Sequence, residues 1–215
     1  MLDVRLGTPA PELVDQVVDH LRRQGIVAMP TETVYGLSCL LQEPLLREVR
    51  RLKGREGDRP FLVLVPDAGS VSDLAWTPQA RELSEVFWPG ALTLVLRDPS
   101  RRFPEGVRSQ EGGVAVRVSP HPVARAVVER AGEPLVSTSA NQPGGPPALS
   151  AQEALSVAVA LGAGEGLWVL DGGTLTPSEP STIVDCTGPE PVVLRAGAVP
   201  LHRLRCVLPE IHGPA

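Results

Sequence analysis

The sequence has few aromatic residues, few cysteines and no long apolar stretch. Aromatic side chains make up 3% of the 215 residues, so the chain has few of the stacking platforms that readers of single-stranded nucleic acid need. Its longest apolar runs have the length of a strand, which disfavours a membrane span. The first residues, Met1 to Arg5, lack a basic flank followed by an apolar stretch. We therefore expect no signal peptide and a cytoplasmic location.

The cysteines and histidines do not form a recognisable metal-binding pattern. Cys39, Cys186 and Cys206 are an odd number, lie far apart and include no C-x-x-C pair, which supports neither a disulfide framework nor a zinc ribbon. The 4 histidines show no H-x-x-x-H spacing. We expect no metal held by the protein alone.

The composition is that of a folded domain with an acidic surface. Apolar residues make up 42% of the chain and charged residues 21%, which is enough to bury a core. The formal net charge of −5 gives no overall field that would attract nucleic acid. We expect one domain over residues 1–200 and a C-terminal tail over residues 201–215.

Helical and strand patterns alternate along the chain without an internal repeat. The expected helices cover residues 13–21, 44–53, 78–87, 122–131 and about 150–161. The expected strands cover residues 26–29, 61–65, 91–96, 114–118, 135–136, 167–170, 182–184 and 192–194. Because the last strands follow one another through short turns, they cannot all be parallel. The pattern predicts an α/β (α+β) domain with a mixed sheet.

A compact cationic turn stands before the expected strand at 61–65. Lys53, Gly54 and Arg55 are followed closely by Arg59. Positive charges this close repel one another unless an anion neutralises them. The turn therefore indicates a phosphate-binding site.

Two further segments place small polar side chains after a strand. Thr31, Glu32 and Thr33 follow the strand at 26–29, and Ser137, Ser139 and Asn141 lie in a Gly-rich segment. Hydroxyls and free backbone N–H groups at a sheet edge suit phosphate or ribose oxygens. A helix N-cap at Thr31 and a plain Ser/Asn turn are the competing interpretations. For Glu32 a magnesium contact is possible, but we favour a nearby Arg as its partner.

Two arginines occupy unusual positions. Arg117 lies inside the apolar run 114–118, where a central strand would bury it, and Arg195 lies between an apolar strand and Gly197. A buried guanidinium needs an anion, either a ligand or a carboxylate of the protein. The segment from Pro180 to Asp185 places another hydroxyl, Ser181, at a strand boundary.

Seven strings in order resemble one known family. They are PTETVYGL, KGR with a following RP, WPGALTLVL, VAVRVSPHP, STSAN, PSTIVD and LRAG, and they run from about Gly25 to Gly197. Each string is weak alone, but their order resembles the YrdC-type threonylcarbamoyl-AMP synthase family. The chain is similar to the short form of that family, without an additional C-terminal domain.

The resemblance implies an open, twisted mixed sheet flanked by helices around a large concave cavity. It implies a nucleotidyltransferase that makes L-threonylcarbamoyladenylate and pyrophosphate from ATP, L-threonine and bicarbonate. It also implies Mg²⁺ carried by the ATP phosphates, and a downstream transferase complex that modifies the adenosine beside the tRNA anticodon. Contact of this chain with tRNA itself would then be indirect or weak.

The resemblance also assigns roles to individual residues. It implies catalytic roles for Lys53 and Arg55, which would hold the triphosphate and the forming carbamate. Contacts to ATP are further implied for Ser139, Asn141 and Arg195. The residues implied around threonine and bicarbonate are Thr31, Tyr35, Arg117, Ser137 and Ser181.

The chain departs from the family pattern at a few positions. Leu64 stands where some relatives carry a His that contacts threonine, and Glu56 and Ala91 stand where Pro is common. These changes bear most on the choice of amino acid. Any closure over the site by this chain would have to come from residues 200–215.

Two other function classes stay open at this stage. One is a non-enzymatic RNA-binding or ribosome-assembly module, which the acidic net charge and few aromatic residues disfavour. The other is a carbamoyltransferase-type YrdC-like domain. In hydrogenase maturation proteins that domain is joined to an acylphosphatase unit and Cys-rich zinc fingers, and the present sequence contains neither.

Overall fold

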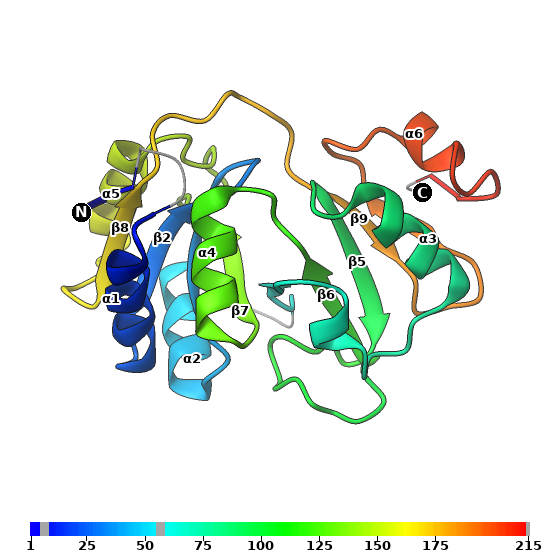
Figure 1. Ribbon diagram of the computed structural model, residues 1–215, viewed down its shortest axis with the longest axis horizontal. Helices are drawn as coiled ribbons and strands as arrows, with labels where there is room; N and C mark the ends of the chain where they lie inside the picture. The colour runs from blue at the N-terminus through cyan, green and yellow to red at the C-terminus, as the bar shows by residue number, and fades with distance from the viewer. Residues whose placement is uncertain (5–8, 55–58, 214–215) are drawn as a thin grey trace.

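In the part of the chain that the structure describes, ten strands form one mixed sheet (Figure 1). The computed structural model describes residues 1–4, 9–54 and 59–213. The order across the sheet is β1-β8-β2-β3-β7-β4-β6-β5-β9-β10. The sheet contains both parallel pairs, such as β2/β8 and β4/β6, and antiparallel pairs, such as β3/β7 and β5/β6. The expected mixed sheet is therefore confirmed.

The strands are β1 Leu2–Asp3, β2 Ile26–Pro30, β3 Tyr35–Leu40, β4 Leu62–Leu64, β5 Leu92–Arg97, β6 Gly113–Arg117, β7 Leu135–Ser139, β8 Leu167–Asp171, β9 Thr182–Asp185 and β10 Val192–Arg195. The helices are α1 Pro11–Arg22, α2 Glu43–Leu52, α3 Pro78–Phe87, α4 Pro122–Ala131, α5 Ala151–Ala160 and α6 Leu201–Arg205, with a 3₁₀ turn at Gly69–Val71.

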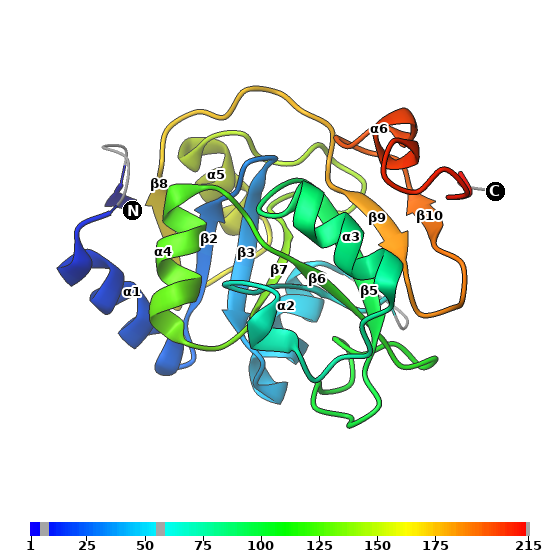
Figure 2. The same cartoon turned by 45° about the vertical axis from the view of Figure 1, so that its right-hand side comes forward.

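Helices cover both faces of the sheet around β2, while the part around β5 has a helix on one face. The helices α1 and α4 pack against each other and against β2, while α5 packs on β2 and β8. Figure 2 shows α4 in front of the sheet, α5 behind it and α3 over β5. Strands β2 and β3 are buried along their whole length. They form the centre of the core.

Local signals set the helix ends. Thr77 Oγ1 accepts a hydrogen bond from the Ala80 N–H (3.1 Å) at the start of α3, and Gly132 ends α4 in the left-handed conformation (φ 73°). Ser150 Oγ accepts from the Glu153 N–H (3.2 Å) before α5, which is one of the two hydrogen bonds of a capping box. The Glu153 carboxylate accepts from Leu149 N–H (2.7 Å), one residue before the cap.

Three strands differ from the sequence-based expectation, and the first is the two-residue strand β1, which is too short to show a pattern. Strand β3 was not predicted, because the Thr and Gly residues around it are typical of turns and its complete burial removes the polar alternation of a half-buried strand. Strand β7 continues through Ser137–Ser139, which the sequence suggests as a loop. Its backbone pairs with β3 on one side and β4 on the other, and this pairing overrides the turn preference.

Along β6, β5 and β9, successive side chains alternate between the core and a cavity. Val116, Leu94 and Val184 are fully buried, whereas the alternate positions Ala115, Val95 and Ile183 line a cavity. Successive side chains of a strand point to opposite faces. The same strands therefore build the core with one face and the cavity wall with the other.

The C-terminal segment expected to be a tail packs against the core. It begins with α6, and Leu204, Leu208 and Ile211 are buried. His212 forms an isolated bridge with Val192 of β10. Residues 201–212 thus cover the β10 end of the sheet, where α6 lies in Figure 2.

Candidate active site

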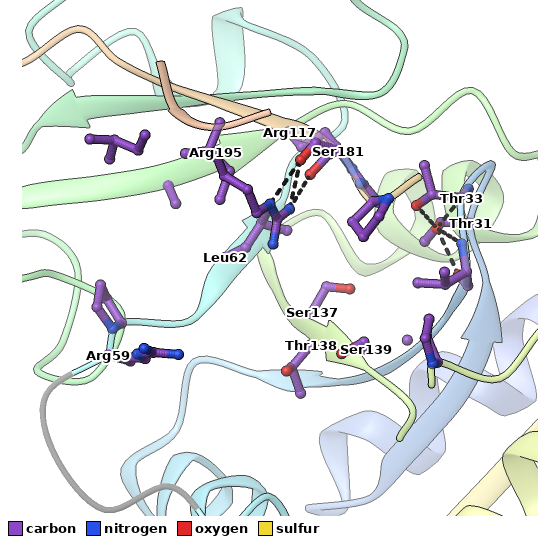
Figure 3. Close-up of a pocket in the computed structure, with 18 of the residues that line it drawn as sticks. Thr31, Thr33, Arg59, Leu62, Arg117, Ser137, Thr138, Ser139, Ser181 and Arg195 are labelled. Atoms are coloured by element: carbon purple, nitrogen blue, oxygen red, sulfur yellow. Dashed lines mark hydrogen bonds between the residues drawn. The ribbon is translucent and has the colours of Figure 1, made fainter. Parts of the chain in front are cut away.

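A cavity of about 590 Å³ lies over the open face of the sheet (Figure 3). Its polar lining consists of Arg59, Arg117, Arg195, Thr31, Thr33, Ser137, Thr138, Ser139 and Ser181. None of the described lining residues carries a carboxylate. Guanidinium groups and hydroxyls without an acidic counterpart suit an anionic ligand. The volume lies in the range of about 300–1,000 Å³ that is usual for small-molecule sites.

The turn between β2 and β3 presents two of the hydroxyls. Thr31 Oγ1 donates to the carbonyl of Val34 (2.8 Å) and accepts from the Thr33 and Val34 N–H groups (both 3.3 Å). The turn leads into β3 and not into a helix, so the N-cap interpretation of Thr31 is wrong. The network holds Thr31 and Thr33 in the cavity wall, as Figure 3 shows.

Arg117 reaches the cavity from the end of β6 and is buried. Its Nε lies 3.8 Å from Glu32 Oε1, a distance at which the charges attract but no hydrogen bond forms. Burial lowers the pKa of Arg117, and the negative charge of Glu32 partly opposes that shift. The structure therefore supports the expectation that Glu32 is the partner of a nearby Arg.

Arg195 and Ser181 form a second polar cluster. Arg195 Nη2 donates to the Ser181 carbonyl (2.7 Å) and Ser181 Oγ (3.2 Å), while Thr93 Oγ1 lies 2.8 Å from the same Oγ. A Cβ on Gly197 would lie 2.9 Å from the Ser181 carbonyl oxygen, so this packing requires glycine. Burial lowers the pKa of Arg195, and the positive charge of Arg117 lowers it further. The two guanidinium groups thus repel each other across the cavity wall.

Strand β7 lines the side of the cavity opposite Arg195 with a row of two hydroxyls, Ser137 and Ser139, on one face of the strand (Figure 3). Thr138 also belongs to the lining, but its side chain leaves the strand on the other face. Gly36 of β3 lies against this row, and a Cβ there would lie 2.8 Å from Ser137 Oγ. Glycine at this position leaves room for the hydroxyl.

Lys53 holds the end of β7 in place through hydrogen bonds. At the end of α2, its ammonium donates to the Ser139 carbonyl (2.8 Å), the Asn141 carbonyl (2.8 Å) and Asn141 Oδ1 (2.5 Å). Ser139 Oγ donates to the same Asn141 Oδ1 (2.6 Å). Lys53 and Asn141 are thus connected to the cavity through Ser139 and are absent from its described lining.

Tyr35 lies in the core. Its hydroxyl donates to the Gly173 carbonyl (2.7 Å) and accepts from the Gly172 N–H (3.1 Å), and burial raises its pKa to about 12. In the described structure it braces the segment after β8 and does not line the cavity. Leu64 is buried, and Leu62, two residues earlier, provides the apolar lining on β4.

The structure brings most predicted site residues together. Thr31, Arg117, Ser137, Ser139, Ser181 and Arg195 line one cavity. Arg55 lies outside the described residues. Arg59, which the sequence places in the cationic turn, and Thr33, which it places among the hydroxyls after a strand, line the same cavity. Thr138 also lines it and was assigned no role from the sequence, although it stands between two predicted hydroxyls.

The comparison with known proteins identifies this arrangement. The model of the Sua5/YciO/YrdC family, described as "Telomere recombination", matches residues 19–197. The chain belongs to this family. A threonylcarbamoyl-AMP synthase of Bacillus subtilis is 34% identical over 210 residues, which cover 96% of the chain and 59% of the relative. A putative threonylcarbamoyl-AMP synthase of Mycobacterium tuberculosis is 38% identical over 89% of the chain and 87% of the relative.

A solved structure of a Sua5/YciO/YrdC family member also matches. The crystal structure of Pyrococcus abyssi Sua5 complexed with L-threonine has a TM-score of 0.88 and 33% identity. The match covers 99% of this chain and 62% of the Pyrococcus chain. The present family member thus spans about three fifths of the length of the Bacillus and Pyrococcus relatives. Among its described residues, no helix has the length and apolarity needed to cross a membrane.

Proposed function

We propose that the chain is an L-threonylcarbamoyladenylate synthase, a nucleotidyltransferase that converts ATP, L-threonine and bicarbonate into threonylcarbamoyl-AMP and pyrophosphate. The observation that carries the proposal is the cavity lined by three guanidinium groups and a row of hydroxyls, with no carboxylate among its described lining. The names of the relatives and the complex of Pyrococcus Sua5 with L-threonine support the same reaction.

The reaction needs little acid–base chemistry. The free amine of threonine adds to bicarbonate to give an N-carboxylate and water. This carboxylate attacks the α-phosphorus of ATP, the new C–O–P bond forms, and pyrophosphate leaves with the electrons of the broken P–O bond. Catalysis then rests on positioning and on neutralising charge.

Electrostatic repulsion is the main barrier that the protein has to lower. At an effective dielectric constant of about 20, two unit negative charges at ~4 Å repel by about 4 kcal/mol. Arg117 lies where it can hold the carboxylate of threonine, Arg195 would contact the nucleotide, and Arg59 lies at the far end of the cavity (Figure 3). Fixed cations at these points would stabilise the transition state.

The hydroxyls and the cationic turn complete the proposed binding scheme. Thr31, Ser137 and Ser181 would contact threonine, and Ser139 and Asn141 would contact the nucleotide phosphates. Lys53 and Arg55 keep their proposed catalytic role at the triphosphate, with Arg59 as a third cation of the same turn. The position of Lys53 behind Ser139 supports a role beside the β7 hydroxyls.

Magnesium would enter with ATP. The described lining offers hydroxyls and no carboxylates, and Mg²⁺ is usually bound through phosphates and waters. The ion would supply charge neutralisation at the leaving pyrophosphate. The residues of the protein would bind and orient the phosphates around it.

The chemistry of the proposed product indicates which reaction would follow and where the enzyme would act. Threonylcarbamoyl-AMP is a mixed anhydride, so a transferase complex has to pass its acyl group to the adenosine beside the tRNA anticodon. We propose a cytoplasmic location because ATP and tRNA are found there. Contact of this chain with tRNA would be indirect or weak, in keeping with its net charge of −5.

Mass spectrometry of the reaction products tests the proposal. The chain is incubated with ATP, Mg²⁺, bicarbonate and a panel of amino acids, and we expect an adenylate that forms with threonine and requires bicarbonate. Carbamoyl phosphate in place of bicarbonate and threonine serves as the control for a carbamoyltransferase, and a tRNA gel shift without ATP as the control for an RNA-binding module. Absence of the adenylate with every amino acid would refute the proposal.

A further inference from the structure

Glu32 connects two walls of the cavity without lining it. It lies in the turn between β2 and β3, and its Oε2 accepts a 2.5 Å hydrogen bond from Ser119 Oγ. Ser119 follows β6 by two residues and also accepts from the His121 N–H (3.2 Å). In the sheet, β7 and β4 separate β3 from β6. The carboxylate therefore reaches past two strands to the segment that carries Arg117.

The second carboxylate oxygen faces Arg117 without a hydrogen bond. Glu32 Oε1 and Arg117 Nε are both buried, lie 3.8 Å apart and have no hydrogen-bond partner among the described residues. A buried unpaired polar atom is costly, so such a pair calls for an explanation. The attraction between the two charges is retained at this distance.

The two edges of the Arg117 guanidinium lie in different surroundings. An arginine can bind a carboxylate through its Nε edge or through its two Nη groups. The Nε of Arg117 is buried beside Glu32, while the residue still lines the cavity. The end that remains for a ligand in the cavity is therefore the Nη end.

We propose that Glu32 is a positioning residue that holds the Nε edge of Arg117 and turns its two Nη groups toward the carboxylate of the amino-acid substrate. The proposal rests on the proposed function. It assigns the effect to the charge of Glu32, whose Oε1 lies 3.8 Å from the Arg117 Nε and attracts it without a hydrogen bond. The hydrogen bond from Ser119 fixes the carboxylate in place.

The test is a kinetic comparison of Glu32→Gln with the wild type. Gln keeps the size and can still accept from Ser119, but it removes the charge. We expect KM for L-threonine to rise about tenfold, equivalent to about 1.4 kcal/mol, with kcat and KM for ATP nearly unchanged. Glu43→Gln is the matched control, because Glu43 pairs with Arg47 on an exposed helix surface (2.7 Å).

A double-mutant cycle shows whether Glu32 acts through Arg117. Lysine lacks the forked donors of arginine, so in an Arg117→Lys background Glu32→Gln should cause little further rise in KM. Additive effects would overturn the proposal, as would an unchanged or lower KM for threonine, or equal rises in both KM values.

Two provisions keep the test decisive. If Glu32→Gln fails to fold, Ser119→Ala takes its place, because this variant keeps every charge and removes the hydrogen bond that fixes the carboxylate. A smaller rise in KM for L-threonine is then expected, and no rise contradicts the proposal.

If the wild type makes no adenylate, the proposed function is wrong. Calorimetric binding of L-threonine to the same variants then tests whether Glu32 positions Arg117.

Discussion

At the scale of single residues, Lys53 is a cation that the protein itself uses to hold a strand end. Its ammonium donates to three oxygens of Ser139 and Asn141, and the side chain is buried. At the C-terminal end of α2 a positive charge is also favourable for the helix dipole. Lys53 therefore holds the end of β7 and brings positive charge close to the hydroxyl row.

Replacing Lys53 should damage both turnover and stability. In Lys53→Met the side chain keeps its length but loses the ammonium, so three partly buried acceptors of Ser139 and Asn141 lose a donor. We expect pyrophosphate release to fall about 100-fold and the melting temperature to fall as well. Arg51→Met is the control, because Arg51 pairs with Glu48 at the surface (2.7 Å) and should matter little. Near wild-type turnover in Lys53→Met would refute this role.

At the scale of elements, β7 explains how hydroxyls can be presented in a row. It lies between two antiparallel neighbours, with Ser137 opposite Ser38 of β3 and Leu62 of β4. The backbone of β7 is therefore held on both sides, and its side chains cannot shift along the strand. Gly36 on β3 leaves the space that Ser137 Oγ occupies.

Gly36→Ala should separate ligand binding from folding. The added Cβ would lie 2.8 Å from Ser137 Oγ and force that hydroxyl to move. We expect KM for threonine to rise several-fold, with a small change in stability, since alanine costs less conformational entropy than glycine in a strand. Gly164→Ala is the control, because a Cβ there meets nothing within 4 Å. An unchanged KM in Gly36→Ala would show that Ser137 does not contact the substrate.

The elements also show what the sequence could predict. The ends of α3 at Pro78–Phe87 and of α4 at Pro122–Ala131 were predicted correctly, because proline marks the start of each, whereas α1 and α2 differ from the predicted ranges by one or two residues. Strand β3 was missed, because full burial removes the alternation by which strands are recognised. The residue types of Ser137–Ser139 are typical of a turn, so the sequence suggested one. The strand forms because β7 pairs with β3 and β4, whose residues lie about 100 and 75 positions earlier and are not part of any local pattern.

The contacts within the site depend on the whole fold in the same way. The pattern around Arg117 predicted that it needs an anion, and the structure supplies Glu32 from a turn 85 residues earlier in the chain. The hydrogen bond between Ser119 and Glu32 joins residues 87 positions apart. Such pairs follow from the order of the strands in the sheet, which spacing along the chain does not reveal.

At the scale of the whole molecule, an acidic protein encloses a basic cavity. The net charge is −5, yet the described lining of the cavity carries guanidinium groups and no carboxylate. The overall field does not attract ATP from a distance, so binding has to come from the cations inside the cavity. The mixed sheet makes this possible, because one face of its strands packs into the core while the other stays open to a ligand.

The most direct test of this account is a crystal structure of the chain with L-threonine and a non-hydrolysable ATP analogue bound. The account predicts both ligands in the cavity of Figure 3, with the threonine carboxylate at Arg117 and the phosphates between the β7 hydroxyls and Arg59. Ligands bound elsewhere on the molecule, with that cavity empty, would contradict it.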